Sequence, residues 1–146
     1  MILDTTYLLP LALIQIDTDL LRAIADEKAD LKLEEMTVNM ISIFELQAKA
    51  AKLMVPAKFV VEAVKAISMG FKVEPFSRPE IVETAYELKK IIPDYIDCVI
   101  VGTAAVLKDD LITEDSRILS KREYLKEKYG VNISSYKELV PESVTH

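Results

Sequence analysis

The chain has no tryptophan and very few residues that carry thiol or imidazole chemistry, with one cysteine, Cys98, and one histidine, His146, in 146 residues. A single cysteine cannot form a disulfide within the chain, which fits a reducing compartment. His146 is the last residue, and we interpret it as a remnant of a purification tag. The sequence therefore offers no internal disulfide framework and no histidine chemistry.

Long apolar runs are also missing. None reaches the roughly 18 residues that a membrane span needs, because charged residues interrupt even the apolar N-terminal stretch. The segment 8–16 resembles the middle of a signal peptide, but Asp4 precedes it and no basic start is present, which disfavours export. We expect a cytoplasmic protein with no membrane segment.

The composition is that of a folded globular chain, with 51% hydrophobic and 29% charged residues and a formal net charge of −6. The chain contains only 3 glycines, and no Gly/Ser-rich linker, internal repeat or low-complexity block divides it. We expect one domain over 1–140 and a flexible tail over 141–146.

Hydrophobic periodicity predicts strands that alternate with helices. The expected strands cover 1–3, 37–41, 71–76, 111–113 and 131–133. The expected helices begin at 6 and then cover 17–30, 42–52, 56–69, 77–91, 94–107 and 115–129. This order is typical of right-handed crossovers over a parallel sheet, so we predict an α/β fold, a single three-layer α/β/α domain with a central parallel sheet of about four to five strands.

Four acids stand near element ends. Asp4 ends the first strand, Asp115 follows the fourth, and Glu45 lies in the first turn after the second. In open parallel sheets ligands bind beyond the carboxyl ends of the strands, so we expect these three at one rim. Asp97, in the first turn after Pro93, must reach the same rim from its helix.

Carboxylates forced together repel one another, and a divalent cation relieves that repulsion. Oxygen ligands without cysteine or histidine select magnesium or manganese. Such an ion polarises a phosphoryl oxygen and makes bound water more acidic, and a second ion can stabilise the leaving oxygen. The pattern therefore points to phosphodiester hydrolysis.

Each acid also has a purely structural explanation. Ser42 and Glu45 have the spacing of a capping box, and Asp94 and Asp97 have a similar spacing at the next helix start. Asp115 fits a simple helix cap. Asp4 is harder to explain in this way, because a carboxylate after a buried strand is desolvated unless a cation meets it.

Taken together, four segments resemble the blocks of PIN-domain ribonucleases, most closely the compact prokaryotic toxins of the VapC type. They are 2–9, 40–46, 95–105 and 111–115, which read ILDTTYLL, MISIFEL, YIDCVIVGTAA and LITED. The resemblance extends from Ile2 to Ile133. It implies a parallel sheet with clustered acids, a magnesium or manganese cofactor, and endonucleolytic cleavage of RNA.

The resemblance also assigns roles by position. Asp4 and Asp97 match the primary metal ligands, and Glu45 and Asp115 complete the set of four acids. Thr113 matches a family hydroxyl expected to orient a metal-bound water.

Three more residues near these positions have open roles. Thr6 stands where the family tends to carry a small hydroxyl residue. Asp94 and Glu114 are extra acids, either alternative ligands or capping and solvated groups. Cys98 next to Asp97 has no histidine as a base, so we expect a buried small residue rather than a nucleophile.

A pI near 4.9 is a poor overall match for RNA, a polyanion. Metal ions would offset part of the local negative charge, and five basic residues occupy helices expected to begin at the acidic rim. They are Lys49, Lys52, Arg117, Lys121 and Arg122. A solvated helix face is the alternative explanation for them.

The resemblance to VapC-type toxins also implies binding partners, and other functions remain as alternatives. VapC-type toxins form homodimers and take an antitoxin segment across the groove, and the apolar segments 8–16 and 59–67 would suit a partner surface or core burial. A catalytically silent binding module and a housekeeping RNA-processing nuclease are the alternatives. A phosphoacceptor receiver domain is set aside, because Asp4 stands alone and no Lys-Pro pair occurs.

Overall fold

The computed structural model describes residues 1–141. Of the tail expected over 141–146, only Pro141 falls in this range, and the rest of the tail, with His146, lies outside the described residues. The strands are β1 (Ile2–Leu3), β2 (Thr37–Asn39), β3 (Lys72–Glu74), β4 (Leu111–Ile112) and β5 (Ile133–Ser134). The helices are η1 (Thr5–Ala12), α1 (Leu20–Ala25), η2 (Leu33–Glu35), α2 (Met40–Lys52), α3 (Ala57–Gly70), α4 (Pro79–Leu88), α5 (Tyr95–Leu107), α6 (Ser116–Leu119), α7 (Arg122–Tyr129) and α8 (Tyr136–Leu139).

The five strands form one sheet in the order β3-β2-β1-β4-β5. All four pairings are parallel, with Ile2 opposite both Thr37 and Leu111 in the register. The first strand is therefore central, and the chain turns to the other side of it when it enters β4. This confirms the predicted parallel sheet.

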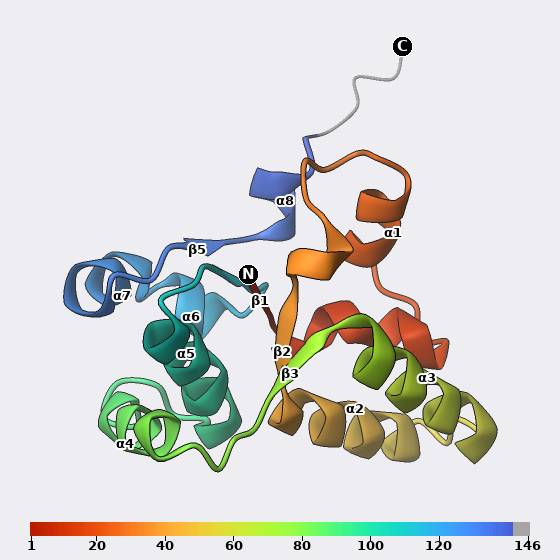
Figure 1. Ribbon diagram of the computed structural model, residues 1–146, viewed down its shortest axis with the longest axis horizontal. Coiled ribbons are helices and arrows are strands. Elements are labelled where there is room, and N and C mark those ends of the chain that lie inside the picture. Colours follow the sequence, from red (N-terminus) through yellow and green to blue (C-terminus); the bar gives the residue numbers. More distant parts are fainter. Residues whose placement is uncertain (142–146) are drawn as a thin grey trace.

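Alternate side chains of the strands point to opposite faces and build two separate hydrophobic cores. Leu3 and Ile112 pack in the core beneath η1, α1, α2 and α3, whereas Ile2 and Leu111 pack in the core beneath α4, α5, α6 and α7. Figure 1 shows these two groups of helices on either side of β1 and β2. The arrangement is the predicted three-layer α/β/α domain.

Helix α2 begins earlier than the sequence pattern suggests. The strand expected over 37–41 ends at Asn39, whose side chain accepts a hydrogen bond from the amide of Ile41 at 2.8 Å and caps the helix. The capping box weighed as an alternative for Ser42 and Glu45 is therefore not formed, because Ser42 lies inside the helix and is fully buried. Glu45 is left with its side chain free of a capping role.

Helix α5 begins where the sequence predicts. The side chain of Asp94 accepts a hydrogen bond from the amide of Ile96 at 2.8 Å, and the helix ends at Leu107 before Lys108 adopts a left-handed conformation with φ 53°. Its middle is almost entirely buried between the sheet and α4. This helix carries Asp97 in its first turn.

Several predicted helices are too long. The helix expected over 17–30 covers only Leu20–Ala25, because Asp19 caps it and Glu27 takes a positive φ of 58° soon after its end. The helix expected over 115–129 is divided into α6 and α7, with the hydroxyl of Ser120 bonded to the carbonyl of Arg117 at 2.9 Å near the break. Such local side-chain bonds compete with the helical ladder.

Other differences are small. The helix expected from Thr6 onward is a 3-10 helix that contains Pro10, which has no amide to continue an α-helical ladder. Gly70 is the last residue of α3 rather than the residue after it, and the last strand is Ile133–Ser134 instead of 131–133. The short helix α8 was not predicted.

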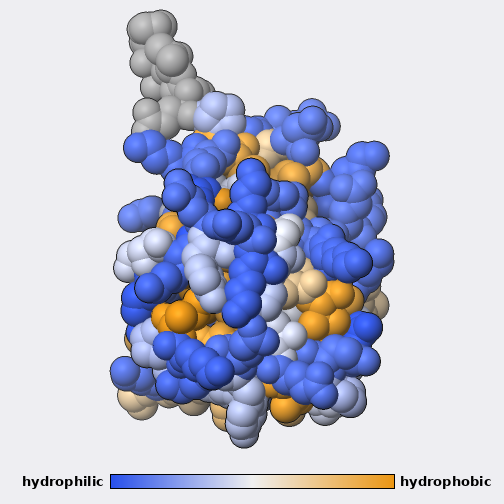
Figure 2. Space-filling model, turned by 90° about the vertical axis from the view of Figure 1, so that its left-hand side faces the viewer, coloured by the Kyte–Doolittle hydropathy of each residue, from blue (hydrophilic) through white to orange (hydrophobic). Residues whose placement is uncertain are grey.

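Within residues 1–141, no helix combines the length and the apolar character needed to cross a bilayer. The side of the molecule that carries α7 presents a mostly hydrophilic surface on which the apolar patches are small and separate (Figure 2).

Candidate functional site

Six acids and two basic residues line a single cavity of about 350 Å³. The residues around it are Asp4, Thr6, Glu45, Lys49, Asp94, Asp97, Glu114, Asp115 and Arg117. They come from the segments that follow β1, β2 and β4 and from the start of α5. All four acids predicted as ligands therefore meet in one cavity, together with both extra acids.

Asp4 lies directly after β1 and is 6% exposed. One carboxylate oxygen accepts the amide of Thr5 at 2.7 Å, and the other accepts the hydroxyl of Thr113 at 2.6 Å. Burial, together with the nearby charges of Glu45 and Asp115, raises the pKa of Asp4 although both hydrogen bonds oppose the rise. Thr113, predicted to orient a water, thus holds Asp4 in place across the β1–β4 pair.

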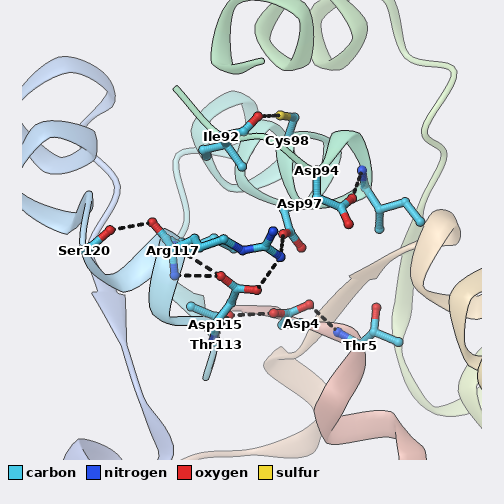
Figure 3. Close-up of polar contacts among 12 residues, drawn as sticks. Asp4, Thr5, Ile92, Asp94, Asp97, Cys98, Thr113, Asp115, Arg117 and Ser120 are labelled. Atoms are coloured by element: carbon cyan, nitrogen blue, oxygen red, sulfur yellow. Dashed lines mark hydrogen bonds and ion pairs between the residues drawn. The ribbon is translucent and has the colours of Figure 1, made fainter. Parts of the chain in front are cut away.

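Asp97 is the second buried acid, with 8% of the residue exposed. Burial raises its pKa to about 7, and the negative charges of Asp4, Asp115 and Asp94 contribute further. Its carboxylate and that of Asp4 approach the cavity from helix α5 and from the strand end (Figure 3). At neutral pH a carboxylate with this pKa is only partly ionised, and a bound cation would favour its ionised form.

Asp115 serves both as a cap and as a wall of the cavity. Its Oδ1 accepts the amides of Arg117 and Ile118 at 2.9 and 3.2 Å, so the simple cap weighed from the sequence is present. The guanidinium of Arg117 lies 3.3 Å from Asp115 Oδ2 and 3.4 Å from Asp97 Oδ2 (Figure 3). Burial opposes the effect, but the hydrogen bonds from Arg117 and Ile118 hold the pKa of Asp115 below its usual value.

Helix α2 supplies Glu45 and Lys49, which lie one turn apart and both line the cavity. Asn39 fixes the start of this helix, and its amide also donates to the hydroxyl of Thr103 in α5 at 2.8 Å. This buried bond ties the helix that carries Glu45 to the helix that carries Asp97.

The two extra acids have structural partners. Asp94 caps α5. Glu114 accepts hydrogen bonds from the buried hydroxyl of Tyr7 and, at 2.7 Å, from the amide of Tyr136 at the start of α8. Burial and the neighbouring Glu114 raise the pKa of Tyr7, which keeps its hydroxyl protonated as the donor. Tyr7 could not be identified from the sequence, because its partner lies 107 residues away.

Cys98 points away from the acids. It is buried, its thiol donates to the carbonyl of Ile92 at 3.3 Å, and burial raises its pKa to about 11. The predicted role as a small buried residue is confirmed.

Only part of the basic set named from the sequence reaches the acids. Lys49 and Arg117 line the cavity, whereas Arg122 binds the carbonyl of Ile133 and lies 2.8 Å from Glu138. Lys52 and Lys121 are exposed. Two positive charges thus face six acids.

The chemistry of the cavity fits a hard divalent cation. Its donors are carboxylate oxygens, the type that magnesium and manganese prefer. The hydroxyls of Thr5 and Ser42, one next to Asp4 and the other one turn before Glu45, are buried without a hydrogen-bond partner. Among residues 1–141, however, no three acidic, cysteine or histidine side chains converge tightly enough to form a ready-made ion site. Rotation of side chains around Arg117 would be needed to bring the acids together.

Comparison with known structures supports the same fold. The chain matches a toxin–antitoxin complex from Klebsiella pneumoniae with 20% identity and a TM-score of 0.59, over 79% of this chain and 86% of that one. VapBC2 from Rickettsia felis, bound to a DNA fragment from its promoter, matches with 14% identity and a TM-score of 0.63, over 92% and 96% of the two chains. FitAcB from Neisseria gonorrhoeae matches with 18% identity and a TM-score of 0.63, over 94% and 99%.

These identities are low and establish the fold alone. No curated protein matches the chain. The family model described as the PIN domain, in contrast, matches residues 1–123, which include all the acids that line the cavity. Proteins of this type are generally nucleases. With the parallel sheet and the acidic cavity at its carboxyl edge, this match leads to one conclusion: the chain belongs to the PIN domain family.

Proposed function

We propose that the protein is a magnesium- or manganese-dependent endoribonuclease that hydrolyses RNA phosphodiester bonds in the acidic cavity. The observation that carries the proposal is the convergence of six carboxylates on one cavity, two of them buried with raised pKa values. Burying acids together destabilises a fold. Their convergence is therefore best explained by a cation that the acids bind when the protein functions.

Asp4 and Asp97 would be the main ligands, with Glu45 and Asp115 as the outer pair. A bound divalent cation supplies Lewis-acid polarisation of the phosphoryl oxygen and a more acidic water. Thr113 keeps the carboxylate of Asp4 oriented through its 2.6 Å hydrogen bond. This arrangement requires no nucleophilic side chain.

Lys49 and Arg117 would contact the phosphates of the RNA. Both line the cavity, and a guanidinium can bind a phosphate through two parallel hydrogen bonds. Arg117 now lies between Asp97 and Asp115, so entry of a divalent cation would release it toward the substrate. The positive charge needed against a polyanion is thereby concentrated in the cavity of an otherwise acidic protein.

We further propose that the protein is the toxin of a type II toxin–antitoxin pair and forms a cytoplasmic homodimer. One solved structure that shares its fold is described as a toxin–antitoxin complex, and others are of VapBC2 and FitAcB. Large apolar side chains on α2, on α3 and between them are exposed, and a partner chain would cover them. They are Phe44, Leu53, Met54, Val61 and Met69. Most of segment 8–16, by contrast, packs into or against the core.

Two other functions would use the same fold. A catalytically silent binding module would retain the cavity without cutting RNA, and a housekeeping nuclease would cut RNA without an antitoxin. The two basic residues in the cavity also suit a phosphate-binding module, which is the observation that favours the first of these.

The test is cleavage of a labelled panel of single-stranded and hairpin RNAs in magnesium, in manganese and in EDTA. Asp4→Asn and Asp97→Asn should abolish metal-dependent cutting, while Asp109→Asn, an acid outside the cavity lining, should not. Cutting that persists in EDTA or in both cavity variants would contradict the proposal. Intact, folded wild-type protein that cuts none of the RNAs with either metal would support the binding module instead.

A further inference from the structure

A second cavity, lined by aromatic residues, lies between the end of α4 and the start of α5. It has a volume of about 370 Å³ and is lined by Tyr86, Lys89 and Tyr95. Tyr86 and Lys89 belong to or directly follow α4, and Tyr95 is the first residue of α5. None of these side chains has a role in the proposed hydrolysis.

The two tyrosines form an exposed aromatic corner. Their ring centroids lie 5.7 Å apart at an interplanar angle of 83°, and the residues are 69% and 39% exposed. Rings set at right angles leave ring faces open on which a flat group can stack. Exposed tyrosines paired in this way do not contribute to the hydrophobic core, since neither belongs to its two clusters.

The aromatic corner and the acidic cavity share the start of α5. Asp94 lines the acidic cavity, and the next residue, Tyr95, lines the aromatic one on the side of the helix that faces Tyr86 of α4. A nucleotide strand whose phosphate lies among the acids would carry a neighbouring base to the tyrosines. Lys89 adds a positive charge there for the adjoining phosphate.

We propose that Tyr86 and Tyr95 form a base-stacking subsite for single-stranded RNA, next to the position of the scissile phosphate. The inference rests on the proposed ribonuclease function and extends it to substrate selection. Stacking on aromatic rings accepts any base and requires an unpaired one, so the subsite would select single-stranded or looped regions over helical RNA.

The test measures RNA binding by fluorescence anisotropy with a short labelled single-stranded RNA, in an Asp97→Asn background that prevents cutting. Tyr86→Leu and Tyr95→Leu should each weaken binding by roughly fivefold to a hundredfold, the range expected for loss of one stacked base. Tyr95→Phe keeps the ring and should bind like the background. Tyr124→Leu removes a comparably exposed tyrosine on α7 and is the matched control.

Abasic RNA localises the effect. In the background protein, removing one particular base near the cut should weaken binding, and in Tyr95→Leu the same abasic RNA should bind no worse than the intact RNA. Unchanged binding in both leucine variants, with normal metal-dependent cleavage by the wild-type chain, would overturn the subsite and leave the ribonuclease proposal standing. A wild-type chain that neither binds nor cuts RNA would overturn both. Loss of self-association in ultracentrifugation, with RNA binding intact, would identify the corner as a protein contact and overturn the subsite.

Discussion

Replacing Asp97 by asparagine should stabilise the fold in EDTA while it abolishes metal binding. The carboxylate is buried and faces Asp4 and Asp115, and burial together with these charges raises its pKa to about 7 from 3.8. At ~1.4 kcal/mol per pH unit, this shift corresponds to about 4 kcal/mol of lost stability when the group is ionised. An asparagine of the same shape carries no such penalty.

The sign of the pH dependence follows from the raised pKa. Between pH 4 and 7 the unfolded chain ionises Asp97 while the folded chain keeps the proton, so the stability of the wild-type protein falls as pH rises through this window. At pH 8 the asparagine variant should therefore be more stable by up to about 4 kcal/mol, and at pH 5 by about 2 kcal/mol.

Urea unfolding at both pH values, with EDTA present, measures the difference directly. Asp30→Asn is the matched control, since Asp30 is exposed and lies outside the acidic cavity. Saturating manganese should reverse the order, because only the wild-type protein would gain free energy from a bound ion. An asparagine variant no more stable than wild type at pH 8 in EDTA would refute this account of the cavity.

Three further predictions address the neighbours of the acids. Arg117→Gln should tighten manganese binding about tenfold in calorimetry, because the guanidinium that competes for Asp97 and Asp115 is gone; weaker binding would contradict this. Asn39→Ala should lower the free energy of unfolding by about 2–4 kcal/mol, through loss of the α2 cap and of the buried bond to Thr103; a loss below about 0.5 kcal/mol would make that bond unimportant. Tyr7→Phe should cost about 1–3 kcal/mol by removing a buried donor to Glu114, and unchanged urea unfolding would argue against it.

The fold was largely predictable because hydrophobic periodicity reports which side chains each element buries. The alternation of apolar strands and amphipathic helices gave the parallel sheet, and Asp94 marked the start of α5. Element ends were less predictable, because several residues compete to cap a helix. Asn39 and Ser42 both fit the start of α2. The structure makes Asn39 the cap, because the pairing of β2 with β3 ends there, with Asn39 opposite Glu74.

The convergence of the acids on one site could also be predicted from the sequence, since the carboxyl ends of parallel strands meet at one edge of the sheet. What the sequence could not reveal is which polar groups meet across the fold. Thr113 reaches Asp4 over 109 residues, and Tyr7 reaches Glu114 over 107. The position of Arg117 between two acids was equally hidden, because a helix pattern says only that a basic residue is present, not which group it faces.

The central claim, that the acidic cavity holds a catalytic divalent cation, is tested most directly by measuring manganese binding and RNA cleavage on the same preparation. Electron paramagnetic resonance gives the bound manganese, and a labelled single-stranded RNA gives the cleavage rate. We predict that the two rise together with manganese in the wild-type protein and that both are lost in Asp4→Asn and Asp97→Asn. Cleavage without bound manganese, or undiminished manganese binding in both variants, would contradict the claim.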